Sequence, residues 1–243
     1  MGKAVQALSV LPGFDPRAVP ALPLPDLPPV PPEHLTPDAL RVRFRHPPAW
    51  APDVRQEPRL ASAAPRRAAV LMPLVTHPGG LTVLLTERTT QLRTHAGQIA
   101  FPGGQADPQD RDPAATALRE AGEEIALPPA AAQVLGLLPP YVTSSRYNVT
   151  PVVALIDPDF TPRQNPVEVA QIFEVPLSFL MNPAHHRWHR YMQDSGPGGP
   201  ARAYEWFSMP WHGPAAFGGP PHDWFIWGVT AGMLRNFYRF LAA

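Results

Sequence analysis

The 243-residue chain contains no cysteine and a single lysine, Lys3. Without cysteine there are no disulfides, thiolate metal sites or cysteine nucleophile, and the chain fits a reducing compartment. A Walker A loop needs a lysine after its glycines, which excludes P-loop chemistry, and Schiff-base chemistry is disfavoured for the same reason. Positive charge in any site must therefore come from arginine, histidine or a metal ion.

A strong net charge and long apolar runs are also missing. The chain carries 20 basic and 20 acidic residues, so its formal charge is zero and nothing indicates broad binding to nucleic acid or an acidic membrane. No apolar run approaches the roughly 20 residues of a membrane-spanning helix, and the N-terminus lacks the apolar segment of a signal peptide. We therefore expect a soluble, cytoplasmic protein that binds neither nucleic acid nor membrane.

Proline is abundant, with 36 residues, and residues 12–32 consist mostly of Pro, Ala, Leu and Val. Proline this dense blocks helices and sheet ladders. Residues 1–65 are therefore predicted to be a poorly ordered, proline-rich extension. Within it, residues 36–45 fit a short helix with Thr36 as N-cap and Pro37 at the first position. The compact domain is expected at residues 66–243.

Hydrophobic patterning in the compact part predicts a mixture of strands and helices. Residues 68–75 and 81–86 are predicted to form a hairpin around Pro78-Gly79-Gly80, and further strands are expected at 133–138, 152–156 and within 172–179. Helices are predicted at 112–125 and 227–241, whereas 184–219 has no clear period. The absence of a regular βαβ repeat favours an α/β fold with a mixed sheet and helices on its faces.

The helix predicted at 112–125 carries three acids on one side. Asp112 can cap it, and an apolar face opposes an arc of about 100° that holds Glu120, Glu123 and Glu124. Clustered carboxylates repel one another, and a cation would relieve the repulsion. Carboxylate oxygens suit Mg²⁺ or Mn²⁺, which also bridge phosphate oxygens. The alternative for such a short acidic pattern is a solvated surface.

A glycine pair precedes this helix, in the segment Phe101-Pro102-Gly103-Gly104. Glycines allow the backbone to approach a ligand closely, so Gly103 and Gly104 are candidate substrate-binding residues. A plain turn is the alternative explanation for a Gly-Gly pair considered alone.

Together these segments resemble the Nudix box, G-x5-E-x7-R-E-U-x-E-E-x-G-U, where U is aliphatic. Gly104 supplies its glycine, and residues 119–127 (REAGEEIAL) contain the complete R-E-U-x-E-E core. Two differences exist. The loop between Gly104 and Arg119 is one residue longer, which leaves Asp110 as the nearest acid to the first Glu, and Ala126 replaces the second glycine.

Residues 84–104 (LLTERTTQLRTHAGQIAFPGG) resemble a second motif, the L-L-T-x-R-[SA]-x3-R-x3-G-x3-F-P-G-G signature of coenzyme A pyrophosphatases. Thr89 replaces the small Ser or Ala. The resemblance implies a Nudix α/β/α sandwich with a loop-helix-loop catalytic motif, and a homodimer is plausible. The implied reaction is metal-dependent hydrolysis of the diphosphate in coenzyme A or acyl-coenzyme A, giving 3′,5′-ADP and 4′-phosphopantetheine.

The resemblance also implies roles for individual residues. Glu120, Glu123 and Glu124 would hold Mg²⁺ or Mn²⁺, Glu123 being counted also as catalytic, and the metal would activate a water. Arg119 would orient a box glutamate through a charge-assisted bond. Glu168 is a candidate further ligand or general base, a helix cap or surface role being the alternative.

Arg88 and Arg93 are candidate phosphate contacts, because arginine forks fit phosphate and coenzyme A carries a 3′-phosphate besides its diphosphate. Structural ion pairs are an equally good explanation for both. His185, His186 and His189 have a spacing that a transition metal could use, but a surface or pocket rim is favoured. The aromatic residues between 206 and 227 are expected in the core or at a dimer interface.

Two alternative functions stay open. The first is a Nudix pyrophosphatase for another nucleoside-diphosphate compound, such as NADH or ADP-ribose. The second is a non-catalytic Nudix-like binding module, which the intact box glutamates and Arg119 disfavour.

Overall fold

The computed structural model describes residues 13–54, 65–90, 97–144, 146–193, 202–215 and 219–243. Its centre is an eight-stranded mixed sheet in which β2 and β8 pair in parallel and the remaining pairs are antiparallel. Its strands are β2 (Arg66–His77), β3 (Gly80–Arg88), β4 (Ile99–Ala100), β5 (Gly103–Gln105), β6 (Ala132–Leu137), β7 (Tyr141–Val142), β8 (Tyr147–Ile156) and β9 (Val169–Pro176). The main path runs β4-β3-β2-β8-β6, while β5, β7 and β9 pair with β2, β8 and β3.

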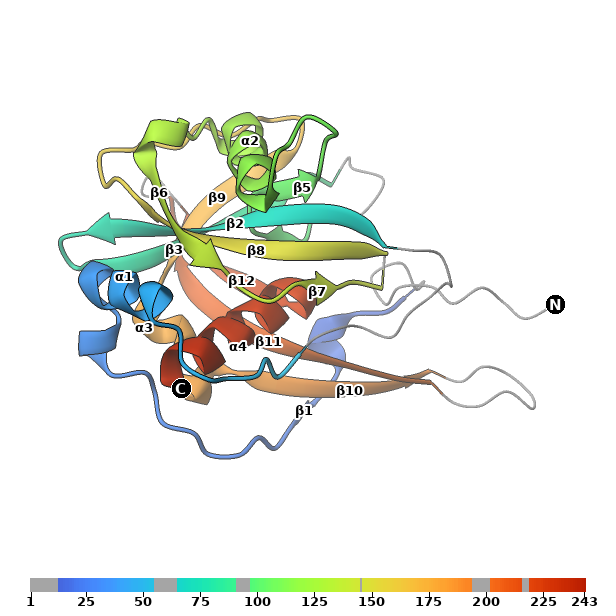
Figure 1. Ribbon diagram of the computed structural model, residues 1–243. Helices are drawn as coiled ribbons and strands as arrows, with labels where there is room; N and C mark the ends of the chain where they lie inside the picture. Colours follow the sequence, from blue (N-terminus) through green and yellow to red (C-terminus); the bar gives the residue numbers. More distant parts are fainter. Residues whose placement is uncertain (1–12, 55–64, 91–96, 145, 194–201, 216–218) are drawn as a thin grey trace.

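Helix α2 (Pro113–Ile125) covers one face of this sheet, and α4 (Gly228–Ala242) lies on the other (Figure 1). Asp112 caps α2 by accepting a hydrogen bond from the amide of Ala115 at 2.8 Å, and Pro113 occupies the first turn, as predicted. Ala117, Ala121 and Ile125 of α2 pack against apolar residues of the central strands. The result is the Nudix α/β/α sandwich predicted from the sequence.

A second, four-stranded antiparallel sheet lies beyond α4, in the order β1-β10-β11-β12 (Figure 1). It is built from β1 (Ala21–Leu22), β10 (Arg187–Gln193), β11 (Arg202–Pro214) and β12 (Pro221–Trp227). Residues 184–219 gave no periodic signal, so β10 and β11 were not foreseen. Phe173 of β9 stacks on Trp224 of β12, with ring centroids 3.9 Å apart, and joins the two sheets. Because α4 is enclosed between the sheets, it is buried nearly all round rather than along one stripe.

The described part of the proline-rich segment packs against this core. The predicted helix is present as α1 (Pro37–Arg45), with Thr36 accepting a hydrogen bond from the amide of Ala39. Val30, Leu35 and Leu40 are buried in the same core cluster as α4. The 65/66 domain boundary stays a prediction, but residues 13–54 are not detached from the domain.

Short elements complete the chain: α3 (Leu177–Leu180) and 3₁₀ turns at Pro16–Ala18, Pro32–His34, Pro129–Ala131 and Pro183–His185. Among the described residues, no helix combines the length and apolarity needed to cross a bilayer.

The burial of α1 predicts that the proline-rich segment contributes to stability. Leu40→Ala removes a fully buried side chain and should lower the free energy of unfolding by about 2–5 kcal/mol. Val42 of the same helix is 56% exposed, so Val42→Ala serves as the control and should change stability by less than about 0.5 kcal/mol. Urea unfolding of both variants measures the difference. Equal, small effects would mean that α1 is not part of the cooperative unit.

Candidate active site

The glycine loop and α2 meet at a buried carboxylate. Glu124 is 2% exposed, and its carboxylate accepts hydrogen bonds from the amide of Gly103 and from Arg88, both at 3.3 Å. Burial, together with the negative charges of Glu168 and Glu120, raises the pKa of Glu124 to about 7, against the lowering effect of Arg88 and Gly103. Glu124 is thus a carboxylate whose ionised form needs additional positive charge.

Both glycines of the loop are required by close packing. Gly103 has φ of +157°, and a Cβ there would lie 2.5 Å from the carbonyl oxygen of Ala69. A Cβ on Gly104 would lie 2.5 Å from the carboxyl carbon of Glu120. A side chain at either position would therefore displace the strand beneath the loop or the glutamate above it.

Arg119 organises the remaining acids of the helix. Its guanidinium donates two hydrogen bonds to Asp110, at 3.2 and 3.0 Å, and one to Glu120 at 2.9 Å. A further bond reaches Glu123 at 3.3 Å. The hydrogen bonds from Arg119, together with one from the amide of Asp107, lower the pKa of Asp110 to about 2. Arg119 therefore holds the carboxylate of Glu120, with Asp110 as its main partner, and its role as the orienting arginine of the box stays a prediction.

One cavity of about 580 Å³ collects most of the predicted site residues. Six of these residues are in its lining: Glu120 and Glu124 of α2, the loop residue Glu168, Arg88, Gly103 and Gly104. Burial also raises the pKa of Glu120, opposed by Arg119 and reinforced by Glu123 and Glu168. The negative charge of Glu168 raises the pKa of both Glu120 and Glu124.

The loop that carries Glu168 is held by the ends of α2 and β3. The amide of Asn165 donates to the carbonyl of Glu124 at 2.9 Å, and the amide of Thr89 donates to the carbonyl of Glu168 at 2.9 Å. Sequence reasoning identified this acid only through the resemblance, since nothing in its local pattern distinguishes it from a loop residue.

Three predicted site residues are not placed in this cavity: Arg119 and Glu123 do not line it, and Arg93 lies outside the described residues. The side chain of Glu123 is 56% exposed and pairs with Arg119. The arc of three acids expected on α2 is thus divided, with Glu120 and Glu124 in the cavity and Glu123 beside it.

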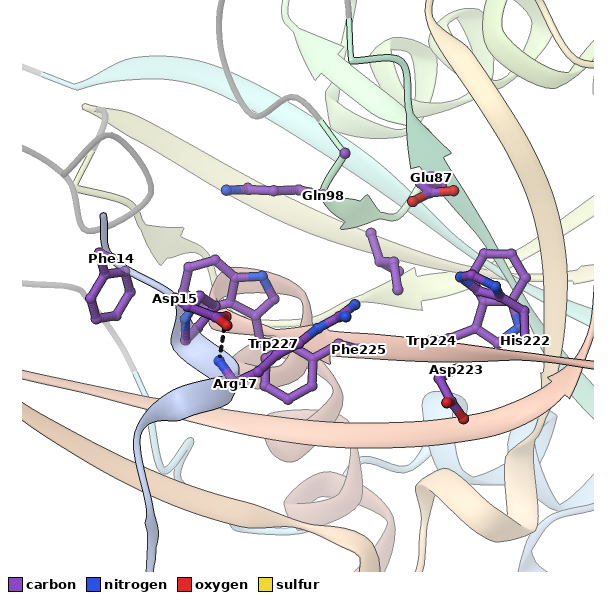
Figure 2. A pocket seen from close by; sticks show the side chains of 13 residues that line it. Phe14, Asp15, Arg17, Glu87, Gln98, His222, Asp223, Trp224, Phe225 and Trp227 are labelled. Carbon is purple, nitrogen blue, oxygen red and sulfur yellow. Dashed lines mark hydrogen bonds between the residues drawn. The ribbon is translucent and has the colours of Figure 1, made fainter. Parts of the chain in front are cut away.

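A smaller cavity of about 240 Å³ adjoins the first, and both are lined by Gln98, Ile99 and Trp227. Figure 2 shows its remaining walls, which come from the N-terminal segment around Arg17, from β3 and from β12. The Arg17 guanidinium lies over the ring of Phe225 at 5.4 Å. Burial raises the pKa of Glu87 in this cavity, against the lowering effects of His222 and Arg17. No local pattern around Arg17, which lies in a proline-rich segment, predicted that it would line a cavity.

The histidine cluster is structural, which corrects the expected surface or rim position of His186 and His189. His186 is 5% exposed, donates to the carbonyl of Leu180 at 2.8 Å and accepts from Arg235 at 3.1 Å. Burial lowers its pKa to about 4. His189 is 4% exposed and bonds to the carbonyl of Val19 and to Ser208. Their buried hydrogen bonds tie β10 to the neighbouring segments.

The acids of the cavity fit a hard divalent cation by their chemistry. Glu120, Glu124 and Glu168 supply only oxygen donors, and two of them have pKa values raised by burial and mutual repulsion. Within the described residues, no three acidic or imidazole groups stand close enough to form a ready coordination site. A cation would therefore draw the glutamates together.

With this geometry in place, comparison with known proteins assigns the class. The NUDIX domain family matches residues 65–195, and the chain belongs to this family. The protein named "Uncharacterized Nudix hydrolase NudL" of Photorhabdus laumondii is 43% identical over 179 residues, which cover 74% of this chain and 87% of the relative. Its namesake in Escherichia coli K12 is 43% identical over 172 residues, or 70% and 80% of the two chains.

Solved structures resemble this chain at lower similarity. The Nudix hydrolase RenU from M. smegmatis is 24% identical, with a TM-score of 0.40, over 48% of this chain and 73% of its own. The MutT protein of Methanosarcina mazei is 21% identical, with a TM-score of 0.39, over 51% and 89%.

The contact between Gly104 and Glu120 predicts a selective effect on metal binding. Gly104→Ala places a methyl group against the carboxylate end of the Glu120 side chain, which can shift without moving the backbone, so the fold should persist while Mn²⁺ affinity falls about 10- to 100-fold. Isothermal titration with Mn²⁺ and thermal unfolding measure the two effects.

Gly122→Ala is the matched control within the same motif. The nearest atom to its added Cβ is the carbonyl oxygen of Leu127, at 3.5 Å, an ordinary contact. Alanine favours a helix over glycine by about 1 kcal/mol, so this variant should keep Mn²⁺ affinity and gain stability. Unchanged metal affinity in Gly104→Ala would show that Glu120 is not a ligand.

Proposed function

We propose that this chain is a metal-dependent hydrolase that cuts the diphosphate bond of coenzyme A or acyl-coenzyme A, releasing 3′,5′-ADP and 4′-phosphopantetheine. The observation that carries the proposal is the convergence of Glu120, Glu124 and Glu168 with Arg88 on one cavity wall. Clustered acids beside a cation suit a substrate whose diphosphate is joined to the protein through metal ions. Family membership supports diphosphate chemistry, and the motif at residues 84–104 supports coenzyme A.

The proposed metal ligands are Glu120, Glu123 and Glu124, with Mg²⁺ or Mn²⁺ as the ion. When bound, such an ion supplies positive charge to the diphosphate and acidifies the attacking water. Glu123 would have to exchange its pairing with Arg119 for the ion. Glu124 gains most from the added charge, because its burial disfavours the ionised form.

The remaining residues would bind and orient the substrate. Arg88 would donate from its guanidinium fork to diphosphate oxygens, and the glycine pair leaves room for a phosphate beside the backbone. Arg119 would hold Glu120 in position through their 2.9 Å hydrogen bond. Glu168 is the proposed general base, accepting a proton from the attacking water.

The shape of the site suits a substrate that is long on both sides of its diphosphate. The larger cavity continues to the smaller one along Trp227 and Gln98.

Product analysis tests the substrate. Coenzyme A, acetyl-coenzyme A, NADH and ADP-ribose are incubated with the enzyme and Mg²⁺ or Mn²⁺, and products are identified by mass spectrometry. The coenzyme A compounds should have the highest kcat/KM and should yield 3′,5′-ADP. If coenzyme A is the poorest of the four, the substrate assignment is wrong; if none is hydrolysed, a binding module becomes the better explanation.

Glu124→Gln tests the catalytic site itself. Turnover should fall by about 100-fold or more, since even partners of metal ligands contribute 10- to 100-fold. The melting temperature should stay equal or rise, because the substitution removes a buried charge. Glu33→Gln, at an exposed glutamate far along the chain, is the control and should leave turnover unchanged. Wild-type turnover in Glu124→Gln would contradict the metal assignment.

A further inference from the structure

Besides Arg88, the wall of the large cavity holds one other arginine, Arg66, at the first position of β2. Arg88 faces the carboxylate of Glu124 at 3.3 Å. Arg66 forms no ion pair with any acid in the described part of the chain; its only side-chain hydrogen bond there is a 3.3 Å contact with the neutral Gln105. Glu205, an acid of the same wall, is paired with Arg190 at 2.7 Å. The positive charge of Arg66 is therefore available to an anion.

The register of the central strands places this charge on the cavity floor. Arg66, Ala68 and Val70 alternate along β2 and all line the cavity, whereas Ala69 and Leu71 pack on the α2 side. In the parallel ladder, Arg66 is the partner of Tyr147, and its guanidinium lies 4.4 Å from the centre of the Tyr147 ring. The ring holds the planar guanidinium by a cation–π contact and leaves its edge free to donate hydrogen bonds.

The distance along β2 between Arg66 and the proposed reaction centre matches the separation of two phosphate groups on one substrate. Val70 pairs with Gly103, whose amide contacts Glu124. Four residues of strand separate Arg66 from Val70, or about 13 Å between their backbones. The floor is thus long enough for a diphosphate at the glutamate end and a second anionic group near Arg66, with a sugar between them.

We infer that Arg66, held on Tyr147, forms a second phosphate subsite that takes the phosphomonoester on the ribose of the substrate. This inference rests on the proposed function and deepens it. It makes Arg66 the residue that distinguishes a 3′-phosphorylated nucleoside diphosphate from one without that phosphate. The two ends of the cavity floor would then bind two separate phosphate groups. The guanidinium of Arg66 would bind the phosphate on the ribose, and Arg88 and the acids would contact the diphosphate.

The test compares coenzyme A with 3′-dephospho-coenzyme A. Arg66→Gln should lower kcat/KM for coenzyme A by roughly 10- to 100-fold, mainly through KM, as expected for the loss of a charge-assisted bond. The same variant should change kcat/KM for 3′-dephospho-coenzyme A less than about twofold. Equal losses on both substrates, or no loss on either, would overturn the inference.

Arg67→Gln is the matched control, because Arg67 is the next residue on β2, is exposed and does not line the cavity. It removes the same charge and should leave the ratio between the two substrates unchanged. A matching loss of preference in Arg67→Gln would mean that general charge, not the subsite, attracts the phosphate.

A binding measurement separates this inference from the proposed function. Calorimetric titration compares adenosine 3′,5′-bisphosphate with adenosine 5′-monophosphate, without any need for turnover. Wild type should bind the bisphosphate at least tenfold more tightly, and Arg66→Gln should bind both alike. Equal affinities in wild type would reject the subsite even if coenzyme A is hydrolysed. Failure to hydrolyse coenzyme A, with the bisphosphate preference intact, would reject only the proposed reaction.

Discussion

The candidate site depends on a carboxylate held where water hardly reaches it. Glu124 lies between α2 and the glycine loop, with the amide of Gly103 and the guanidinium of Arg88 as its partners. Two hydrogen bonds of 3.3 Å do not replace the hydration that burial removes, so the pKa of Glu124 is raised to about 7. A cation bound beside Glu124 would stabilise its ionised form and offset the effect of burial. This arrangement depends on the positions of α2, the glycine loop and β3 together.

The end of α2 links this carboxylate to the other acid of the cavity. Ala126 adopts the left-handed conformation, with φ of 58°, at a position where the Nudix box has glycine. The conformation costs an alanine roughly 1 kcal/mol, but it ends the helix and leaves carbonyls free. Those of Glu124 and Ile125 accept hydrogen bonds from Asn165 and Arg163, in the loop that leads to Glu168. The backbone of Glu124 thus positions Glu168 while its side chain shares the cavity with it.

Local sequence patterns predicted the elements that are stabilised by contacts between residues close together in the chain. The caps Thr36 and Asp112, the hairpin glycines and the periodicity of α2 and α4 all predicted elements that the structure contains. The histidines could not be placed, because the burial of His186 depends on Arg235, 49 residues away. Strands β10 and β11 and the packing of residues 13–54 likewise depend on partners distant in sequence. Helical periodicity placed Glu120 and Glu124 on one side of α2, whereas no local pattern showed that Arg88 would lie beside Glu124.

The second sheet and the packing of the N-terminal segment, which the sequence did not predict, form the outer walls of the site. The central sheet and α2 hold the acids and the glycine loop, which are the proposed contacts for the diphosphate and its metal ion. Trp206 and Trp227, from the second sheet, and Arg17, from the N-terminal segment, form the walls that continue from it. These walls are held by long-range contacts, such as the stacking of Phe173 on Trp224 and the bond from His189 to Val19. Under the proposed function, the acids would act on the bond that is cut and the walls would contact the groups on either side of it. A change of substrate among related proteins would then be expected to alter these walls before it altered the acids.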